Sequence, residues 1–275
     1  MQEIPGKAVA QKLIADLKTL PHPGKILAAI LVGDDTSSQN FLREKEKIAR
    51  QLGVRFKKYD LPGNWSPDQL RREVGRISLQ KSVGGLLVQL PLPNKINPYY
   101  VLNAVPREKD VDVLGERALG AYYSGRNKII PPAVATIEEV LKTAGFDVSG
   151  KKVAVVGPGL LIGKPASVWL LGKVRNLFVI DAGGDFSPLK DADLVICGSG
   201  SAGVVKPAML KDGAGVIDFG YGRNAENKLI GDFAAGELTN KDRERLGFYT
   251  PTPGGTGPIL IAELLNNFFK LTAED

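Results

Sequence analysis

The stretch KKVAVV at 151–156, followed by GPGLLIGKPASVWLL at 157–171, joins an apolar strand to a helix through a glycine-rich turn. Gly157, Gly159 and Gly163 form that turn. Only glycine lets a backbone approach a pyrophosphate closely, and a helix start offers free N–H groups and the positive end of a dipole. The third glycine comes one residue later than in the usual G-x-G-x-x-G pattern. The segment predicts a dinucleotide-binding turn, and the alternative is a tight turn of an α/β fold.

Asp181 ends the next expected strand, at 177–181. It follows the glycines by about twenty residues, the place where an acid bonds the ribose hydroxyls of NAD. A carboxylate there would repel the additional phosphate of NADP, and Ala182, Gly183 and Gly184 follow it rather than an arginine. We therefore expect NADP or NAD as the cofactor, with a preference for NAD. The alternative is a solvated aspartate at the end of a strand.

Strands and helices alternate along the rest of the chain. Apolar runs predict strands at 25–32, 54–60, 84–90, 151–156, 177–181, 193–197 and 215–219, and helical spacing predicts helices at 6–20, 38–52, 67–80, 136–144 and 258–270. Continuous apolar strands separated by helices imply an α/β fold with a parallel sheet covered on both faces. YYSG at 122–125 and the prolines at 131–132 interrupt the pattern, so we expect a domain boundary near 120–132.

Composition narrows the protein class and the compartment. The 275 residues are 43% hydrophobic and 24% charged, which is ordinary for a globular protein. The single cysteine, Cys197, excludes an intrachain disulfide, and the first residues lack the apolar core of a signal peptide. We therefore expect a cytoplasmic protein that does not contact membranes. The net charge of +6 is spread along the chain, which favours an anionic small substrate over nucleic acid.

The expected helix at 38–52 carries a lysine on its apolar face. At about 100° per residue, Lys45 falls in the same arc as Phe41, Leu42, Ala49 and Leu52. The other charged residues of this segment fall outside that arc. Lys45 has two interpretations: its stem packs while the ammonium reaches water, or it lies in a desolvated pocket where a lowered pKa suits acid/base chemistry.

Several segments, in order along the chain, resemble the bifunctional methylenetetrahydrofolate dehydrogenase/cyclohydrolase family of one-carbon metabolism. The longest and most distinctive matches are the proline-rich and glycine-rich motifs. The matching segments are VGD at 32–34, S-x-x-F-x-x-x-K-x-K at 38–47, VQLPLP at 88–93, KDVD at 109–112, DFGY at 218–221, GD at 231–232, PTPGGTGP at 251–258 and the glycine turn.

The resemblance implies a two-domain enzyme. An N-terminal catalytic and folate domain, 1–122, is completed by 255–275, where a C-terminal helix returns to it. A Rossmann domain, 123–254, binds NAD(P), and the active site is expected in the cleft between the two. The resemblance also implies tetrahydrofolate derivatives as substrates and a homodimer. Nucleic acid and membranes are not expected as partners, and no metal is implied.

The implied chemistry has two steps: 5,10-methylenetetrahydrofolate is oxidised to 5,10-methenyltetrahydrofolate with NAD(P)+, and the product is hydrolysed to 10-formyltetrahydrofolate. By resemblance, Lys45 acts in the hydrolysis, Gln89 tunes Lys45 and Asp112 anchors the pterin ring. Taken alone, Gln89 is a strand-end amide and Asp112 a turn carboxylate. The other implied substrate-binding residues are Phe41, Leu90, Pro253, Gly254 and Gly255. The implied cofactor-binding residues are Gly157, Pro158, Gly159, Gly163, Asp181, Gly198, Ser199, Gly200 and Tyr221.

The chain departs from the family pattern at several of these sites. Phe41 stands where the family usually has tyrosine, so a stacking face is kept but a hydroxyl that could bond the lysine is lost. Val113 follows the pterin aspartate where glycine is frequent. Pro158 and Gly159 replace an arginine or alanine followed by serine, which agrees with the expected NAD preference. Two alternatives stay open: a relative with dehydrogenase activity alone, and a folate- or nucleotide-binding protein without turnover.

Overall fold

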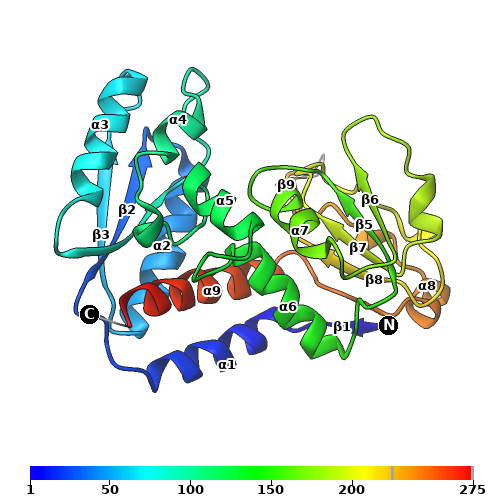
Figure 1. The fold of residues 1–275 in the computed structure, drawn as a ribbon. Coiled ribbons are helices and arrows are strands. Elements are labelled where there is room, and N and C mark those ends of the chain that lie inside the picture. The colour runs from blue at the N-terminus through cyan, green and yellow to red at the C-terminus, as the bar shows by residue number, and fades with distance from the viewer. Residues whose placement is uncertain (224–225, 274–275) are drawn as a thin grey trace. The chain divides into compact units, whose positions relative to one another are not determined.

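The computed structural model describes residues 1–223 and 226–273 and forms two compact units (Figure 1). Unit 1 consists of Met1–Lys12 and Ala133–Leu260, and unit 2 of Leu13–Pro132 and Ile261–Asp275. The first residues join unit 1 because β1 (Gln2–Glu3) pairs in parallel with β11 (Phe248–Tyr249). The boundary between the expected folate domain and the expected Rossmann domain, at 122–123, stays a prediction. Residues 224–225 and 274–275, which fall within the expected domains, lie outside the described residues.

Unit 2 is built on a three-stranded parallel sheet with the order β3-β2-β4. The central strand β2 (Ile26–Val32) is buried almost throughout, and β3 (Arg55–Leu61) and β4 (Val83–Val88) flank it. These strands confirm the α/β pattern predicted from the apolar runs. Because β4 ends at Val88, the next residue, Gln89, leaves the sheet at its carboxyl edge, where its N–H still donates to Ile30 O at 2.9 Å.

The helices of unit 2 begin at residues with side chains that cap them. Asp35 precedes α2 and accepts a hydrogen bond from Ser38 N at 2.7 Å, while Ser66 and Gln69 form a capping box at the start of α3. The short helices α4 and α5 were not predicted, because so few residues show no clear helical period. The helical segments wholly within unit 2 are α2 (Thr36–Gln51), α3 (Pro67–Ser78), α4 (Pro98–Leu102), η1 (Arg107–Lys109) and α5 (Glu116–Tyr123).

Unit 1 contains a six-stranded sheet with the order β1-β11-β8-β7-β5-β6 (Figure 1). The strands β5 (Lys152–Val156), β6 (Asn176–Ile180), β7 (Leu194–Cys197) and β8 (Gly215–Asp218) pair in parallel. The chain passes from β5 to β6 on one side of β5 and then returns to β7 on the other side. This reversal is the topological switch point at which open α/β sheets bind their ligands, and the glycine-rich turn follows β5 directly.

Short elements complete unit 1 around this sheet. A helix, α6, precedes β5, another, α7, follows the glycine-rich turn, and a small antiparallel hairpin of β9 and β10 follows β8. These elements are α6 (Pro132–Ala144), α7 (Gly163–Leu170), η2 (Ser187–Lys190), η3 (Pro207–Met209), β9 (Gly222–Arg223), β10 (Leu229–Ile230), η4 (Ala235–Glu237) and α8 (Asn240–Arg245). Two further helices, α1 (Gly6–Lys18) and α9 (Thr256–Thr272), are divided between the two units, and the first residue of α6, Pro132, belongs to unit 2.

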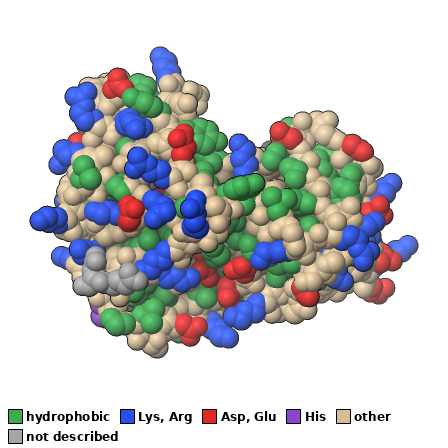
Figure 2. Space-filling view, in the orientation of Figure 1, with side chains coloured by type: hydrophobic (Ala, Val, Ile, Leu, Met, Phe, Trp, Pro, Cys, Tyr) green, Lys and Arg blue, Asp and Glu red, His purple; other side chains and the backbone are tan. Residues whose placement is uncertain are grey.

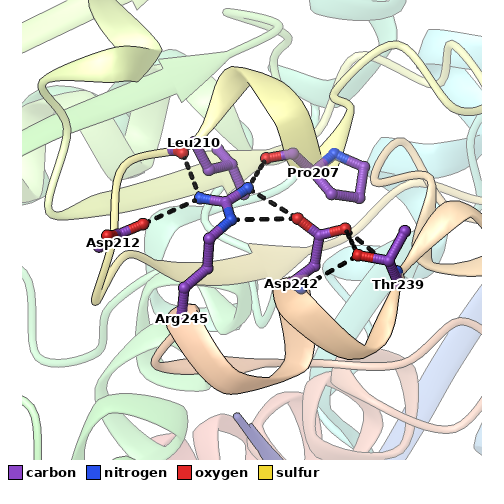
Figure 3. Close-up of polar contacts among 6 residues, drawn as sticks. All are labelled: Pro207, Leu210, Asp212, Thr239, Asp242 and Arg245. Carbon is purple, nitrogen blue, oxygen red and sulfur yellow. Dashed lines mark hydrogen bonds and ion pairs between the residues drawn. The ribbon is translucent and has the colours of Figure 1, made fainter.

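Arg245, at the end of α8, fastens that helix to the segment before β8 (Figure 3). Its guanidinium forms an ion pair with Asp242 at 2.9 Å. It also donates to the carbonyl oxygens of Pro207 and Leu210, at 2.5 and 2.6 Å. Because an arginine presents several donors in a fixed plane, one side chain can hold the helix and the two carbonyls together.

Lysine and arginine side chains are distributed over many separate places on the face seen in Figure 2, among acidic and apolar side chains. This agrees with a net charge of +6 that is spread along the sequence. None of the helices formed by the described residues is long and apolar enough to cross a membrane.

The helix α9 anchors two loops of unit 2 through one buried amide. The side chain of Asn267, 1% exposed, donates from Nδ2 to Val111 O at 2.9 Å and to Ile130 O at 2.8 Å. Val111 precedes α5 and Ile130 follows it, so a single side chain of α9 joins both approaches to that helix. The predicted helix at 258–270 is confirmed.

We predict that Asn267→Ala lowers the free energy of unfolding by about 2–4 kcal/mol, because it leaves two carbonyl groups without their donor in a buried place. Urea-induced unfolding followed by circular dichroism measures this change. The control is Lys270→Ala, on the exposed side of the same helix, which we expect to change the free energy by less than about 0.5 kcal/mol. Equal midpoints for the two variants would contradict the anchoring role of Asn267.

Candidate active site and cofactor pocket

Lys45 lies near the middle of α2 with its ammonium group buried. Only 9% of the residue is exposed, and the same helix face carries the buried Leu42 and Ala49. The ammonium Nζ donates to Gln89 Oε1 at 3.0 Å. The side chain therefore does not extend to water, and of the two interpretations of this lysine the desolvated one describes the structure.

Gln89 is held in the orientation that Lys45 requires. Its Nε2 donates to Leu90 O at 2.7 Å, and the same carbonyl oxygen accepts a bond from Ser38 Oγ at 3.5 Å. Since the carbonyl of Leu90 needs a donor and the ammonium of Lys45 needs an acceptor, only one orientation of the amide satisfies both neighbours. Leu90 thus contributes its backbone, and Gln89 presents its oxygen to Lys45.

The KDVD run at 109–112 assigns a different task to each charged residue. Lys109 Nζ donates to Ser78 O at 2.6 Å, at the end of α3. Asp110 is buried and accepts hydrogen bonds at Oδ2 from Leu114 N at 3.0 Å and Gly115 N at 2.8 Å, which fixes the turn before α5. Burial raises the pKa of Asp110 to about 7, although these N–H groups oppose the rise. Sequence reasoning matched Asp110 to the family motif but assigned it no role, because that role depends on the backbone of the turn.

Asp112 is half-buried and acts electrostatically on Lys45. Burial lowers the pKa of the Lys45 ammonium, and the negative charge of Asp112 opposes that fall. Burial likewise raises the pKa of Asp112, and Lys45 opposes that rise. The pair therefore holds a lysine that releases its proton more readily than an exposed one, which suits acid/base chemistry.

Phe41 and Val113 are the two departures from the family pattern beside this pair. Phe41 precedes Lys45 by four residues, so both lie on one face of α2, and Phe41 is partly exposed. Val113 has φ +57, a left-handed conformation that glycine adopts freely and a β-branched residue rarely does. Its buried side chain packs with Ala118 and Ile129. Burying the valine side chain stabilises the fold by about 1.5–3 kcal/mol. This offsets the cost of the left-handed backbone conformation, which is about 1–3 kcal/mol.

In unit 1, a cavity of about 360 Å³ lies at the carboxyl ends of β5, β6 and β7. Three of the expected cofactor-binding residues, Gly163, Gly200 and Tyr221, are not among the residues that line it, and Tyr221 is 54% exposed. The apolar residues Val156, Ile180, Phe186 and Val204 form part of its wall. The lining includes the expected Gly157, Pro158, Gly159, Asp181, Gly198 and Ser199, together with Ala182, Gly183 and Ser201, which sequence reasoning did not assign.

The glycines of the turn have different tasks in shaping this cavity. A Cβ atom at Gly157 would lie 2.4 Å from Ser199 Cα, and one at Gly163 would lie 2.1 Å from Gly157 O. These two glycines therefore allow close backbone packing. At Gly159 the nearest atom would be Gly198 O at 3.8 Å, so the missing side chain leaves room for a ligand. With α7 starting at Gly163, this geometry fits a dinucleotide pyrophosphate.

The buried carboxylate of Asp232 holds the loop that follows β7 by hydrogen bonds to Ser199 and Gly200. Asp232 Oδ2 accepts hydrogen bonds from Ser199 N at 2.6 Å, Ser199 Oγ at 2.8 Å and Gly200 N at 3.2 Å. These N–H groups point away from any ligand, so Ser199 contacts the cavity without offering its backbone donor. Sequence reasoning matched Asp232 to the family but assigned it no place in the site.

Asp218, at the end of β8, organises the backbone around Asp232. Its Oδ1 accepts from Gly220 N at 2.7 Å and Asp232 N at 3.2 Å, and its Oδ2 accepts from Phe233 N at 2.9 Å. Burial raises the pKa of Asp218 to about 7, and the charge of Asp232 adds to the rise. The same causes raise the pKa of the buried Cys197 thiol. Among the described residues, no group of three or more His, Cys, Asp or Glu side chains could hold a metal.

The PTPGGTGP loop is fastened to the backbone of Asp218 on both sides. Asp218 N donates to Thr250 Oγ1 at 2.7 Å, and Thr256 Oγ1 donates to Asp218 O at 2.7 Å. The expected substrate residues of this loop therefore belong to unit 1, whereas the other five expected substrate residues belong to unit 2. The loop residues are Pro253, Gly254 and Gly255, and those of unit 2 are Phe41, Lys45, Gln89, Leu90 and Asp112.

Family models match both parts of the chain. The model described as tetrahydrofolate dehydrogenase/cyclohydrolase, catalytic domain, matches residues 4–112. The model described as the NAD(P)-binding domain of the same family matches residues 131–275. Together they cover nearly the whole sequence, and the motifs quoted above lie within them.

Individual relatives agree with the family models. A bifunctional protein FolD from Campylobacter hominis is 36% identical over 286 residues, covering 98% of this chain and 96% of the relative, and one from Listeria innocua is 33% identical over 96% and 93%. The crystal structure of the bifunctional FolD dehydrogenase/cyclohydrolase from Campylobacter jejuni has a TM-score of 0.90 at 30% identity and covers 98% of both chains. The Trypanosoma brucei enzyme, complexed with NADP and an inhibitor, has a TM-score of 0.89 at 28% identity, covering 99% of this chain and 97% of that one.

The fold is thus the mixed α/β fold of these two-domain enzymes. The chain belongs to the tetrahydrofolate dehydrogenase/cyclohydrolase family.

Proposed function

We propose that this protein oxidises 5,10-methylenetetrahydrofolate to 5,10-methenyltetrahydrofolate with NAD(P)+ and then hydrolyses the product to 10-formyltetrahydrofolate. The observation that carries the proposal is the buried hydrogen bond from Lys45 Nζ to Gln89 Oε1 at 3.0 Å, with Asp112 acting on the same ammonium. A folate-binding protein without turnover has no need of a desolvated lysine whose pKa is lowered.

In the oxidation, the protein binds and orients two ligands. When bound, the nicotinamide dinucleotide supplies the hydride acceptor. Gly157 and Gly159 form the turn that receives its pyrophosphate, and Asp181 accepts hydrogen bonds from a ribose. Asp112 accepts hydrogen bonds from the pterin ring, while Phe41 offers an aromatic face on the same side of α2 as Lys45. Pro253, Gly254 and Gly255 contribute backbone contacts to the folate.

In the hydrolysis, Lys45 moves protons. A water molecule adds to the methenyl carbon, and neutral Lys45 accepts the proton that the water releases. The bond from this carbon to N5 of the pterin then breaks as the new hydroxyl loses its proton to solvent and becomes the formyl carbonyl, and Lys45 returns a proton to N5. The net reaction consumes one water and releases one proton. Gln89 holds the amine in place through both steps, and the lowered pKa of Lys45 makes its neutral form more accessible than that of an exposed lysine.

We also propose that NAD is the preferred cofactor. Asp181 directly follows β6 and is the one charged residue among the described residues that line the cavity. The 2′-phosphate of NADP would therefore meet a carboxylate without a neighbouring arginine or lysine in that lining. The Trypanosoma brucei relative is complexed with NADP, so the proposed preference for NAD rests on the residues of this chain alone.

The Lys45 assignment is tested first. We predict that Lys45→Met slows hydrolysis of 5,10-methenyltetrahydrofolate, supplied without cofactor, by at least about 100-fold, because the proton-transfer group is removed. Loss of methenyl absorbance measures the rate. The control is Lys47→Met, on the exposed face of the same helix, which should hydrolyse at a rate close to that of the unmodified protein. Equal rates for the two variants would remove Lys45 from the mechanism.

Two further outcomes of this assay bear on the proposal. If the unmodified protein hydrolyses the substrate no faster than buffer but still oxidises the methylene compound, the dehydrogenase-only alternative holds, and Phe41→Tyr becomes the variant in which to look for restored hydrolysis.

If Asp112 acts on Lys45 as described, Asp112→Asn moves the ionisation of Lys45 in the pH–rate profile to lower pH, because a charge that raises the pKa of Lys45 is lost.

The cofactor preference is tested by Asp181→Ser. We predict that the ratio of kcat/KM for NADP to that for NAD rises by about tenfold, because a charge facing the 2′-phosphate is removed. Initial rates of reduced-cofactor formation with each dinucleotide give the ratio. Asp185→Asn, an exposed carboxylate that does not line the cavity, is the matched control and should leave the ratio unchanged. A preference for NADP in the unmodified protein would refute the proposal.

We propose, finally, a cytoplasmic homodimer, with support from the resemblance to the family and from a chain whose one cysteine is buried and reduced. Light scattering of the purified protein at micromolar concentration should give about twice the monomer mass of 29.5 kDa. A mass equal to that of one chain would contradict the dimer and leave the catalytic proposal unaffected.

A further inference from the structure

A buried carboxylate lies directly behind the wall of the cofactor cavity. Asp232 is 0% exposed, and it reaches the cavity only through the loop that it holds, in which Ser199 and Ser201 are lining residues. Its Oδ2 takes up both backbone N–H groups at 199–200 and the Ser199 hydroxyl. The ligand therefore meets Ser199 at a position set by Asp232.

The negative charge at this place is not neutralised by a neighbouring cation. Among residues 1–223 and 226–273, neither Asp232 nor Asp218 forms an ion pair with lysine or arginine, and Asp232 Oδ1 has no hydrogen-bond partner. Asp218 lies close enough for the charge of Asp232 to raise its pKa. In a low-dielectric interior such a charge acts over several ångströms on whatever binds beyond the loop.

The topology of the sheet indicates which part of a dinucleotide lies there. A doubly wound sheet consists of two mononucleotide-binding halves that meet at the switch point. Asp181, after β6, marks the half that binds the adenine ribose. The carboxyl ends of β7 and β8, where the 198–201 loop and Asp218 lie, form the other half, which takes the nicotinamide.

We propose that Asp232 is a positioning residue that also selects the charge of the cofactor: it holds Ser199 and Gly200 at the nicotinamide half, and its negative charge favours the oxidised nicotinamide. The oxidised ring is cationic and the reduced ring is neutral, so an uncompensated negative charge stabilises one and not the other. The consequence is that reduced cofactor is released more readily and replaced by oxidised cofactor. This inference rests on the proposed function of the site.

The test measures binding rather than turnover. Dissociation constants for oxidised and reduced cofactor are determined by calorimetry at pH 8.5, without folate, so that Asp218, with a pKa of about 7, is ionised. In Asp232→Asn the amide oxygen can replace Oδ2, and the amide nitrogen takes the place of Oδ1, which has no donor to lose among the described residues. The matched control is Ser199→Ala, which removes one hydrogen bond to the carboxylate and keeps the charge.

Asp232→Asn should raise the dissociation constant of the oxidised cofactor on the order of fivefold and change that of the reduced cofactor by less than about twofold. Ser199→Ala should change both constants by the same factor. If Asp232→Asn also changes both equally, or changes neither, charge selection is wrong. If Asp232→Asn does not fold, Asp218→Asn, which keeps the Asp232 contacts to Ser199 and Gly200, is expected to shift the ratio in the same direction. An unmodified protein that binds neither cofactor would instead refute the proposed function.

Discussion

The hydrogen bond between Lys45 and Gln89 is the contact on which the folate site depends. A buried ammonium is costly unless an acceptor and a counter-charge lie beside it. The acceptor exists because β4 ends one residue before Gln89, and it is oriented because Leu90 O takes the other end of the amide. The counter-charge exists because Asp110 fixes the turn that carries Asp112. The lysine is thus the point where a strand end, a helix face and a turn meet.

The elements that could be predicted from sequence are those specified by local patterns. The apolar runs predicted β2 to β8 but not the two-residue strands β1 and β11, and the periodicity of α2 placed Lys45 among buried side chains. The glycine turn likewise follows from sequence, because Gly157 and Gly163 are required by close backbone contacts. The short helices α4 and α5 escaped prediction because five and eight residues carry too little periodicity.

What could not be predicted depends on contacts between distant segments. Nothing near Asp232 in the sequence indicates that its carboxylate would hold Ser199, 33 residues earlier. Gln2 and Glu3 join the sheet of unit 1 only because β11 offers a free edge almost 250 residues later, at Phe248 and Tyr249. The distinction between Asp110 and Asp112 has the same origin: the two are alike in sequence and differ only in which neighbours surround them.

Each unit uses a buried aspartate in the same way. Asp110 forms an isolated β-bridge with Leu86 of β4, and Asp218 ends β8. Both accept hydrogen bonds from backbone N–H groups of a following segment, and burial raises the pKa of each to about 7. In each case a second acidic residue, Asp112 or Asp232, is thereby placed toward a functional group: a lysine in one unit, a cofactor loop in the other. Truncating the organising aspartate to alanine would remove these acceptors and free the second one to move, so the position of the charge at each site is set by a residue that itself contacts no ligand. An organising carboxylate can serve in this way because each backbone N–H group that donates to it favours its charged form and opposes the effect of burial.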